Sequence, residues 1–214
     1  MTASGEAFPR PAPGSALIGP NALLQLVPVL DRVGGRQLRQ EIFASAGVFA
    51  LPEADNGMID ETPVARVHQA VRRDLGDLAV AVAWEAGKRT GDYIRVNRIP
   101  RGAQALLRML PEHTASPMLA RAIAKNAWTF VGSGTFRLVS TRPVVFEIVD
   151  NPVVRHEHSD HPLCHWHASV FERLFTKLVD PNLRCEETQC CAMGASACRF
   201  EIKQDAGSGG PKFR

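Results

Sequence analysis

Apolar residues recur at helical spacing through the first 130 residues of the chain. Gly34-Gly35 should end the first helical segment. Thr62-Pro63 and Ser116-Pro117 each resemble a helix start, with a capping hydroxyl before a proline in the first turn. Gly76 is expected to interrupt the long central segment, and the regular pattern stops at Gly91. Helices are therefore predicted at about residues 21–33, 36–46, 62–91, 101–110 and 117–130, with 92–98 as one further turn or a separate short helix.

After Gly132 the pattern changes to short, β-branched, apolar runs that are typical of strands. A turn at 141–143 should join the first two of these runs. Strands are predicted at about residues 135–140, 144–149, 183–190 and 198–203, with a helix at 162–179 between the two pairs. Helices followed by paired strands favour an α+β fold, in which helices pack on an antiparallel sheet.

Composition and pattern together divide the 214 residues into four segments. With 45% hydrophobic residues, the chain can bury one globular core. The predicted segments are a disordered, Pro- and Gly-rich N-terminus at 1–15, a helical extension at 16–60, a main ligand-binding domain at 61–203 and a flexible tail at 204–214.

Charge and hydropathy narrow the compartment and the partners. The formal net charge of +3 is too small to indicate nucleic-acid binding. No stretch reaches the roughly 18 apolar residues that a membrane-spanning helix needs. Residues 1–15 do not resemble an export signal. We therefore predict a cytoplasmic protein that binds no nucleic acid and has no transmembrane segment.

The cysteines and histidines are concentrated in one part of the chain. All five Cys lie between Cys164 and Cys198, and five of the seven His lie between His156 and His167. An odd number of cysteines does not suit a disulfide framework, and clustered cysteines in a reducing compartment more often bind metal. This part of the chain is therefore the first place to look for a metal site.

A metal-binding constellation is predicted from the spacing of four residues. Glu187, Cys190 and Cys198 follow the pattern E-x-x-C-x7-C in a predicted hairpin, and Cys164 begins the preceding helix. Together they would form a closed, tetrahedral, structural zinc site. Strand alternation puts Glu187 and Cys190 on opposite faces, so the site requires a bend or bulge. The alternative is a set of free, buried cysteines, and His161 or His167 could take the place of Cys164.

The C-terminal hairpin also carries a longer motif. It reads Glu187-x-x-Cys190-x-x-x-Gly194-x-x-x-Cys198-x-Phe200-x-Ile202, and the upstream segment Gly87-x-x-x-Gly91-Asp92-Tyr93 accompanies it. Over about residues 80–203 the chain resembles the 4-vinyl reductase domain family. Over its whole length it resembles the members of that family that act in bacteriochlorophyll biosynthesis in purple bacteria.

The resemblance implies a fold, a metal and a ligand. The fold is the one shared by nitric-oxide sensors and vesicle-tethering subunits, which often dimerise, so a homodimer is expected. Zinc is implied at Cys164, Glu187, Cys190 and Cys198, as in the phenol-responsive sensors of the family. The implied ligand is a magnesium tetrapyrrole of the divinyl protochlorophyllide or Mg-porphyrin type. Magnesium chelatase or the next enzyme of the pathway is the implied protein partner.

A tetrapyrrole site needs apolar walls and a group that can ligate magnesium. The candidates are Trp84, Trp128, Phe136, Phe146, His165, Trp166 and His167. For the aromatic residues the alternative is ordinary core packing, and for the histidines it is a polar loop. The arginines after the long helix, among them Arg95, Arg98 and Arg101, would either meet an acid group of the ligand or form a solvated face.

Three functions remain open at this stage. The first is an accessory protein that binds a magnesium tetrapyrrole and passes it between pathway enzymes. The second is the 8-vinyl reductase of the family name, although no nicotinamide, flavin or iron–sulfur motif is visible. The segment Gly132-Ser133-Gly134 precedes a strand and lacks the third glycine of a dinucleotide-binding turn. The third is a zinc-stabilised small-molecule sensor or scaffold.

Overall fold

The computed structural model describes residue 12 and residues 15–53 and 57–205. The helices are α1 (Asn21–Leu24), α2 (Val27–Ser45), α3 (Glu61–Leu75), α4 (Leu78–Asn97), α5 (Arg101–Met109), α6 (Glu112–Lys125) and α7 (His165–Leu178), with short 3-10 turns η1 (Ala127–Thr129), η2 (Pro152–Val154) and η3 (Cys191–Met193). The strands are β1 (Leu17–Ile18), β2 (Ile59–Asp60), β3 (Thr135–Thr141), β4 (Val144–Val149), β5 (Leu183–Gln189) and β6 (Cys198–Gln204). Nearly all of the predicted disordered N-terminus and flexible tail lies outside the described residues.

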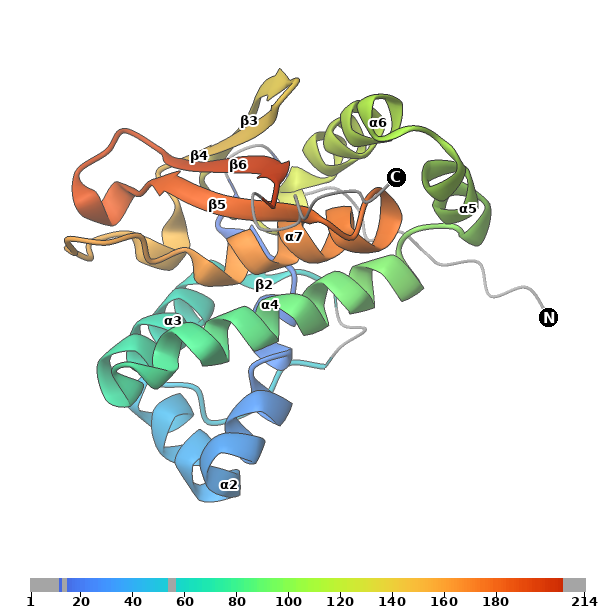
Figure 1. Ribbon diagram of the computed structural model, residues 1–214. Coiled ribbons are helices and arrows are strands. Elements are labelled where there is room, and N and C mark those ends of the chain that lie inside the picture. The colour runs from blue at the N-terminus through green and yellow to red at the C-terminus, as the bar shows by residue number, and fades with distance from the viewer. Residues whose placement is uncertain (1–11, 13–14, 54–56, 206–214) are drawn as a thin grey trace, which may run out of the picture.

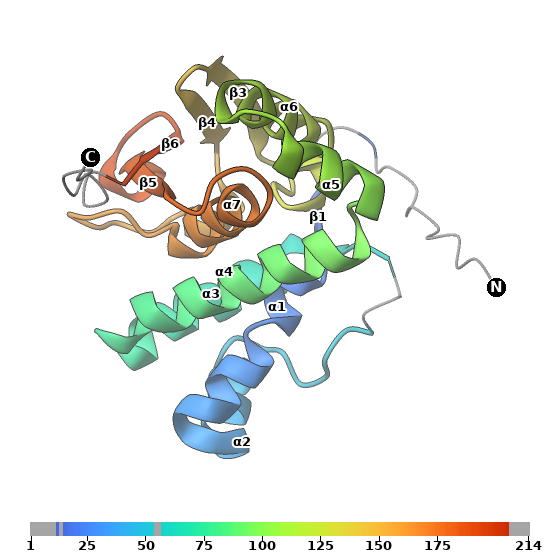
Figure 2. The ribbon, with the colours of Figure 1, turned by 45° about the vertical axis from the view of Figure 1, so that its right-hand side comes forward.

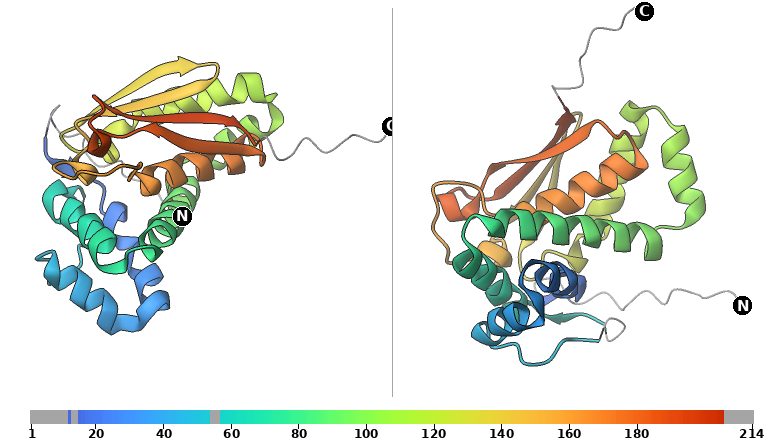
Figure 3. Two further views of the ribbon diagram at one scale, coloured as in Figure 1. Left: turned by 60° about the vertical axis from the view of Figure 1, so that its left-hand side comes forward. Right: turned by 60° about the horizontal axis from the view of Figure 1, so that its bottom comes forward.

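The centre of the fold is a four-stranded antiparallel sheet in the order β3-β4-β6-β5. One face packs on α7, and α4 lies on the far side of α7, so the layers run sheet, α7, α4 (Figures 1 and 3). The inner face carries buried residues such as Phe146 and Phe200. The outer face carries ion pairs such as Arg199 with Glu147. The predicted α+β architecture is thus confirmed.

Two glycines let α4 and α7 approach closely. A Cβ atom added at Gly87 would lie 2.5 Å from the Trp166 carbonyl oxygen, and one at Gly91 would lie 2.7 Å from the Arg173 Cβ. Neither space admits a larger residue without a shift of α7. The pattern suggested that Gly91 ends a helix, whereas α4 continues through it to Asn97. Gly91 is therefore a packing position and not a helix end.

The N-terminal elements form a separate layer below α3 and α4, which Figure 2 shows clearly. Helix α2 runs from Val27 but leaves helical geometry at Gly34 and Gly35, where the sequence predicts a break. Strands β1 and β2 pair with each other and bring this layer to the start of α3. Buried His68 of α3 donates from Nε2 to the Ala22 carbonyl oxygen at 2.9 Å, which ties the layer to the core.

A buried carboxylate joins the start of α3 to the sheet. Glu61 accepts hydrogen bonds from the Ser133 backbone N–H and hydroxyl, each at 2.6 Å, and forms an ion pair with Arg155 at 3.0 Å. Gly132 makes room for it with a positive φ of 56°, and any Cβ there would collide with the Glu61 carboxylate. Gly132-Ser133-Gly134 is thus a structural turn around Glu61.

The predicted start of α6 at Ser116-Pro117 is wrong. The helix begins at Glu112 and includes Pro117, although a proline inside a helix removes one backbone hydrogen bond. The carbonyl of His113, four residues before Pro117, accepts instead from Arg142 Nη2 at 3.0 Å. Because this side chain replaces the lost donor, the helix passes through the proline.

Candidate metal centre

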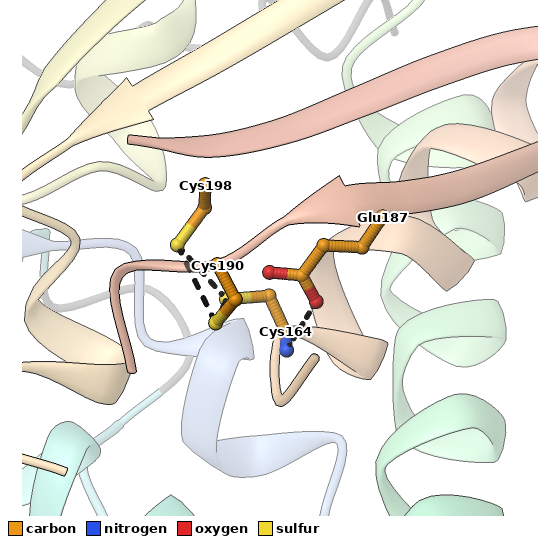
Figure 4. A group of neighbouring side chains, drawn as sticks. All are labelled: Cys164, Glu187, Cys190 and Cys198. Carbon is orange, nitrogen blue, oxygen red and sulfur yellow. Dashed lines mark hydrogen bonds between the residues drawn. The ribbon is translucent and has the colours of Figure 1, made fainter. Parts of the chain in front are cut away.

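Three elements bring the predicted metal ligands to one end of the sheet. Cys164 is the N-cap residue of α7, Glu187 lies near the end of β5, Cys190 follows it, and Cys198 begins β6. Figure 4 shows the four side chains pointing toward one common point. Their candidate ligand atoms all lie within 4.8 Å of one another, and all four residues are buried.

A β-bulge removes the objection raised by strand alternation. Glu187 pairs with Phe200, but Gln189 pairs with Arg199, so β5 has one residue more than β6 across this interval. The extra residue turns Glu187 and Cys190 to the same side of the strand. The bend that the sequence required is therefore present where it was required.

The sulfur atoms have the spacing of thiolates around one ion. The Sγ of Cys164 lies 3.4 Å from that of Cys198 and 4.0 Å from that of Cys190, and the last two are 3.9 Å apart. A tetrahedral site with metal–sulfur bonds of about 2.3 Å, the value for zinc, requires sulfurs about 3.8 Å apart. The cluster fits such an ion, and no disulfide joins the described cysteines.

Hydrogen bonds hold the ligands in place and support negative charge on them. Glu187 accepts from the Cys164 backbone N–H through Oε2 at 2.7 Å, whereas its buried Oε1 has no hydrogen-bond partner. Asn151 donates from Nδ2 to the Cys164 sulfur at 3.3 Å, and the Cys191 N–H donates to the Cys198 sulfur at 3.3 Å. Such donors beyond the ligands orient a metal site and tune it.

The protonation of the cluster depends on whether a cation is present. Burial raises the pKa of the Cys164 thiol well above its ordinary value. Burial, with the Cys190 sulfur nearby, raises the pKa of Glu187 to about 8. Without a cation these groups hold their protons near neutral pH, because burial penalises their charged forms. A divalent ion would displace the protons, so metal binding is coupled to pH.

The histidines near the cluster lie apart from the ligand set. His161 is exposed and pairs with Asp160. His167 is buried in the core, where its Nε2 donates to the Phe130 carbonyl oxygen at 3.4 Å. Cys164 therefore occupies the position for which His161 or His167 was the alternative. His165 is half-buried, and its buried Nε2 has no hydrogen-bond partner.

The aromatic residues predicted as ligand walls fall into separate places. Phe136, Phe146 and His167 lie in one aromatic cluster between α7 and the sheet, with the Phe146 and Phe171 rings 5.0 Å apart. Trp166 faces the other way and donates from Nε1 to the Thr90 hydroxyl at 3.2 Å. The remaining two are partly buried, Trp84 on α4 and Trp128 in η1.

Two pockets open among the described residues. One, of about 90 Å³, lies between α3, α4 and the start of α7, and His68, Arg72 and His165 line it. The other, of about 330 Å³, lies between α6 and the turn end of the sheet, and Pro117 and Ile202 line it. The predicted wall residues therefore do not surround one shared cavity. Of those residues, His165 alone borders either pocket.

The fold and the ligand cluster define a class of protein. Residues 144–204 match the 4-vinyl reductase domain family, and this interval contains all four candidate ligands. In fold, the chain is similar to two solved H-NOX proteins. That from S. oneidensis in the Fe(II)NO ligation state has a TM-score of 0.51, 11% identity and coverage of 87% of this chain and 99% of its own. That from K. algicida, an unliganded Fe(II) mutant, has a TM-score of 0.53, 10% identity and coverage of 87% and 96%. The expected resemblance to a nitric-oxide-sensor fold is confirmed.

Two curated relatives then place the chain within that class. It is 54% identical over 185 residues to the bacteriochlorophyll synthase 23 kDa chain of Cereibacter sphaeroides, across 86% of this chain and 89% of that one. It is 47% identical over 196 residues to the protein of that name from Rhodobacter capsulatus, across 92% and 91%. The chain belongs to the family of the bacteriochlorophyll synthase 23 kDa chains and has a role in bacteriochlorophyll biosynthesis.

Within the described residues, no helix is long and apolar enough to cross a membrane.

Proposed function

We propose that this protein binds a magnesium tetrapyrrole, of the divinyl protochlorophyllide or Mg-protoporphyrin type, and passes it between enzymes of bacteriochlorophyll biosynthesis. The observation that carries the proposal is the nearly full-length identity to two bacteriochlorophyll synthase 23 kDa chains. The fold adds support. A solved H-NOX structure with a TM-score of 0.50 to this chain concerns the function of heme distortion, and heme is also a tetrapyrrole.

His165 is the residue that we propose as the axial ligand of the magnesium. Burial lowers its pKa, so its imidazole is neutral at neutral pH and keeps a lone pair for a metal. Its Nε2 has no hydrogen-bond partner to give up. The pocket beside it, at about 90 Å³, admits only an edge of the macrocycle. We therefore expect the ring to lie across the pocket mouth, near the exposed side chain of Val80, with the His165 imidazole turned toward it.

Pigment titration tests this proposal. Purified protein would be titrated with divinyl and monovinyl protochlorophyllide, and absorbance and fluorescence would report binding. We expect saturable binding at micromolar pigment, weakened about tenfold or more in His165→Ala, a loss of about 1.4 kcal/mol. His158→Ala, which removes an exposed histidine of the same loop, should bind like the unmodified protein. No spectral change at micromolar pigment would contradict the proposal.

The same titration separates carriage from reduction. With reduced nicotinamide or flavin added under anaerobic conditions, a carrier returns the divinyl pigment unchanged, whereas a reductase yields the monovinyl product in proportion to protein. Transfer is tested by adding pigment-loaded protein to magnesium chelatase or to the next pathway enzyme. Faster turnover than with free pigment would support it. The proposed homodimer is tested by sedimentation of the same preparation.

We also propose that the metal is zinc and that its role is structural. Three thiolates and one carboxylate are a ligand set that zinc accepts, and four protein ligands leave no open position for substrate. The unpartnered Oε1 of Glu187 points into the cluster and supports its role as the fourth ligand. Elemental analysis of the purified protein should find one zinc per chain. Protein that is fully folded, stable and free of metal would contradict this proposal.

A further inference from the structure

We propose that the corner formed by the end of α4, the helix α5 and the residues between them, here called the α5 corner (residues 93–111), binds the surface of an anionic membrane. The corner stands at the edge of the molecule in Figures 1 and 2. It combines exposed apolar side chains with a stretch of arginines. Neither the pigment proposal nor the metal site uses it.

Large apolar side chains of the corner project into solvent. Val96 is 63% exposed, Leu106 is 49% exposed and Met109 is 84% exposed. Leu106 and Met109 are three residues apart on α5 and so share one side of that helix. The opposite side, with Gln104 and Leu107, is buried. The exposed apolar side is thus the outer face of a well-packed helix.

The corner is held rigidly to the rest of the fold. The Gln104 amide donates to the backbone carbonyls of Arg95 at 2.6 Å and Ile99 at 2.8 Å, which fixes α5 against the end of α4. Arg108 donates from Nε to the Lys177 carbonyl oxygen at 3.1 Å, at the end of α7. The apolar side chains are therefore presented in a fixed arrangement on a packed element.

The charge of the corner has one sign. Between Asp92 and Glu112 the chain contains no acidic residue, but it contains the four arginines Arg95, Arg98, Arg101 and Arg108. Asp92 partly neutralises the first of them through an ion pair with Arg95 at 3.6 Å. Exposed Lys177 lies next to Arg108 and adds a further positive charge. Each basic residue near an anionic lipid surface contributes about 1 kcal/mol to binding.

These features fit a lipid surface better than a second copy of the chain. Two copies meeting through this corner would set arginine against arginine, because the corner offers no acid to pair with. A membrane interface accepts both parts at once: apolar side chains enter the boundary of the acyl chains while arginines remain among the headgroups. The metal cluster lies at the other end of α7, at Cys164, so membrane binding would leave it uncovered.

Vesicle flotation without pigment tests the proposal separately from tetrapyrrole binding. We expect the protein to float with vesicles that contain phosphatidylglycerol and to remain behind with pure phosphatidylcholine. High salt should release it, because screening weakens the attraction. Two double variants address the two components. Leu106→Gln with Met109→Gln removes the apolar tips, and Arg98→Gln with Arg101→Gln removes charge. Each should weaken vesicle binding about tenfold or more.

A matched control and a folding check complete the experiment. Phe49→Gln removes a side chain that is 85% exposed beyond the end of α2, outside the corner, and should float like the unmodified protein. Thermal unfolding followed by circular dichroism confirms that every variant is folded. The proposal is overturned if the protein ignores anionic vesicles, or if both corner variants float normally. It is also overturned if the corner variants abolish self-association or the binding of an acidic protein while vesicle binding is unchanged.

Discussion

The two ends of the α4–α7 pair follow opposite rules. At the cluster end, groups that can carry charge are buried: Cys164 is 1% exposed and Glu187 is 7% exposed. At the α5 corner, apolar groups face solvent, and Met109 is 84% exposed. Burying a charge and exposing a large apolar side chain both cost free energy, so each needs a compensating partner. A cation compensates the first and an apolar, anionic surface compensates the second.

The largest expected effect comes from removing one sulfur at the cluster end. Cys198→Ala should abolish zinc binding and lower the free energy of unfolding by more than about 4 kcal/mol, because loss of a metal is among the most destabilising lesions. Elemental analysis and denaturant unfolding would measure the two effects.

Cys185→Ala provides the matched control. It removes another buried sulfur of the same hairpin from outside the ligand set. It should keep its zinc and lose only about 1 kcal/mol, as for a small cavity. Equal losses of stability in the two variants, with zinc unaffected by either, would show that the cluster is ordinary core.

The next effect is the pH dependence of stabilisation by zinc. In the metal-free fold the pKa of Glu187 is about 8, above its ordinary value of 4.5. A raised pKa in the folded state stabilises the metal-free protein below pH 4.5, and this contribution is lost as pH rises toward 8. Zinc holds the carboxylate deprotonated, so the zinc-loaded protein does not suffer that loss.

The difference in stability between zinc-loaded and metal-free protein should therefore grow from about pH 6 to about pH 8. The Glu187 carboxyl alone accounts for about 2–3 kcal/mol of this growth, since one pKa unit corresponds to about 1.4 kcal/mol. Unfolding at a fixed free zinc concentration, compared with unfolding in chelator, would measure it. A difference that stays flat over this range would show that no buried proton is displaced.

Glu187→Gln should have an intermediate effect that depends on zinc. The substitution keeps the shape but removes the charge that a metal requires, so zinc affinity should fall about tenfold or more, or about 1.4 kcal/mol. In chelator at about pH 6 the native carboxyl is itself neutral, and the variant should differ by less than about 1 kcal/mol. Competition with a chromophoric chelator would report the affinity, and equal zinc affinities would remove Glu187 from the ligand set.

The smallest effect on stability is expected at the α5 corner. Leu106→Gln with Met109→Gln should change the free energy of unfolding by no more than about 0.5 kcal/mol per site, since both side chains face solvent. A larger loss, measured by denaturant unfolding without lipid, would mean that these side chains pack within the protein. The comparison between the two ends would then lose its basis.

Much of the fold and the metal cluster could be predicted because their signals are local. Strand β4 (Val144–Val149) has its predicted bounds, since alternation and β-branching are properties of neighbouring residues. The ligand set was accessible because cysteine spacing in a hairpin restricts the geometry closely. The bulge between Glu187 and Gln189 could be required from the sequence, although its form could not.

What the sequence did not reveal depends on distant contacts. Pro117 sits within α6 because Arg142, from the β3–β4 turn, supplies the missing donor to His113. Gly91 allows α7 to approach, and that contact links residues far apart in the chain. No local pattern contains either partner. The same holds for buried Glu61, whose partners Ser133 and Arg155 lie far along the chain.

The bulge in β5 has a consequence for recognising this site in other chains. It turns Glu187 and Cys190 to one side although three positions separate them. A regular strand with one residue fewer would also place a glutamate and a cysteine on one side, since side chains alternate with a period of two. Relatives could therefore gain or lose a codon here and keep the same four ligands, provided that the bulge comes or goes with it. A search restricted to one spacing would overlook them.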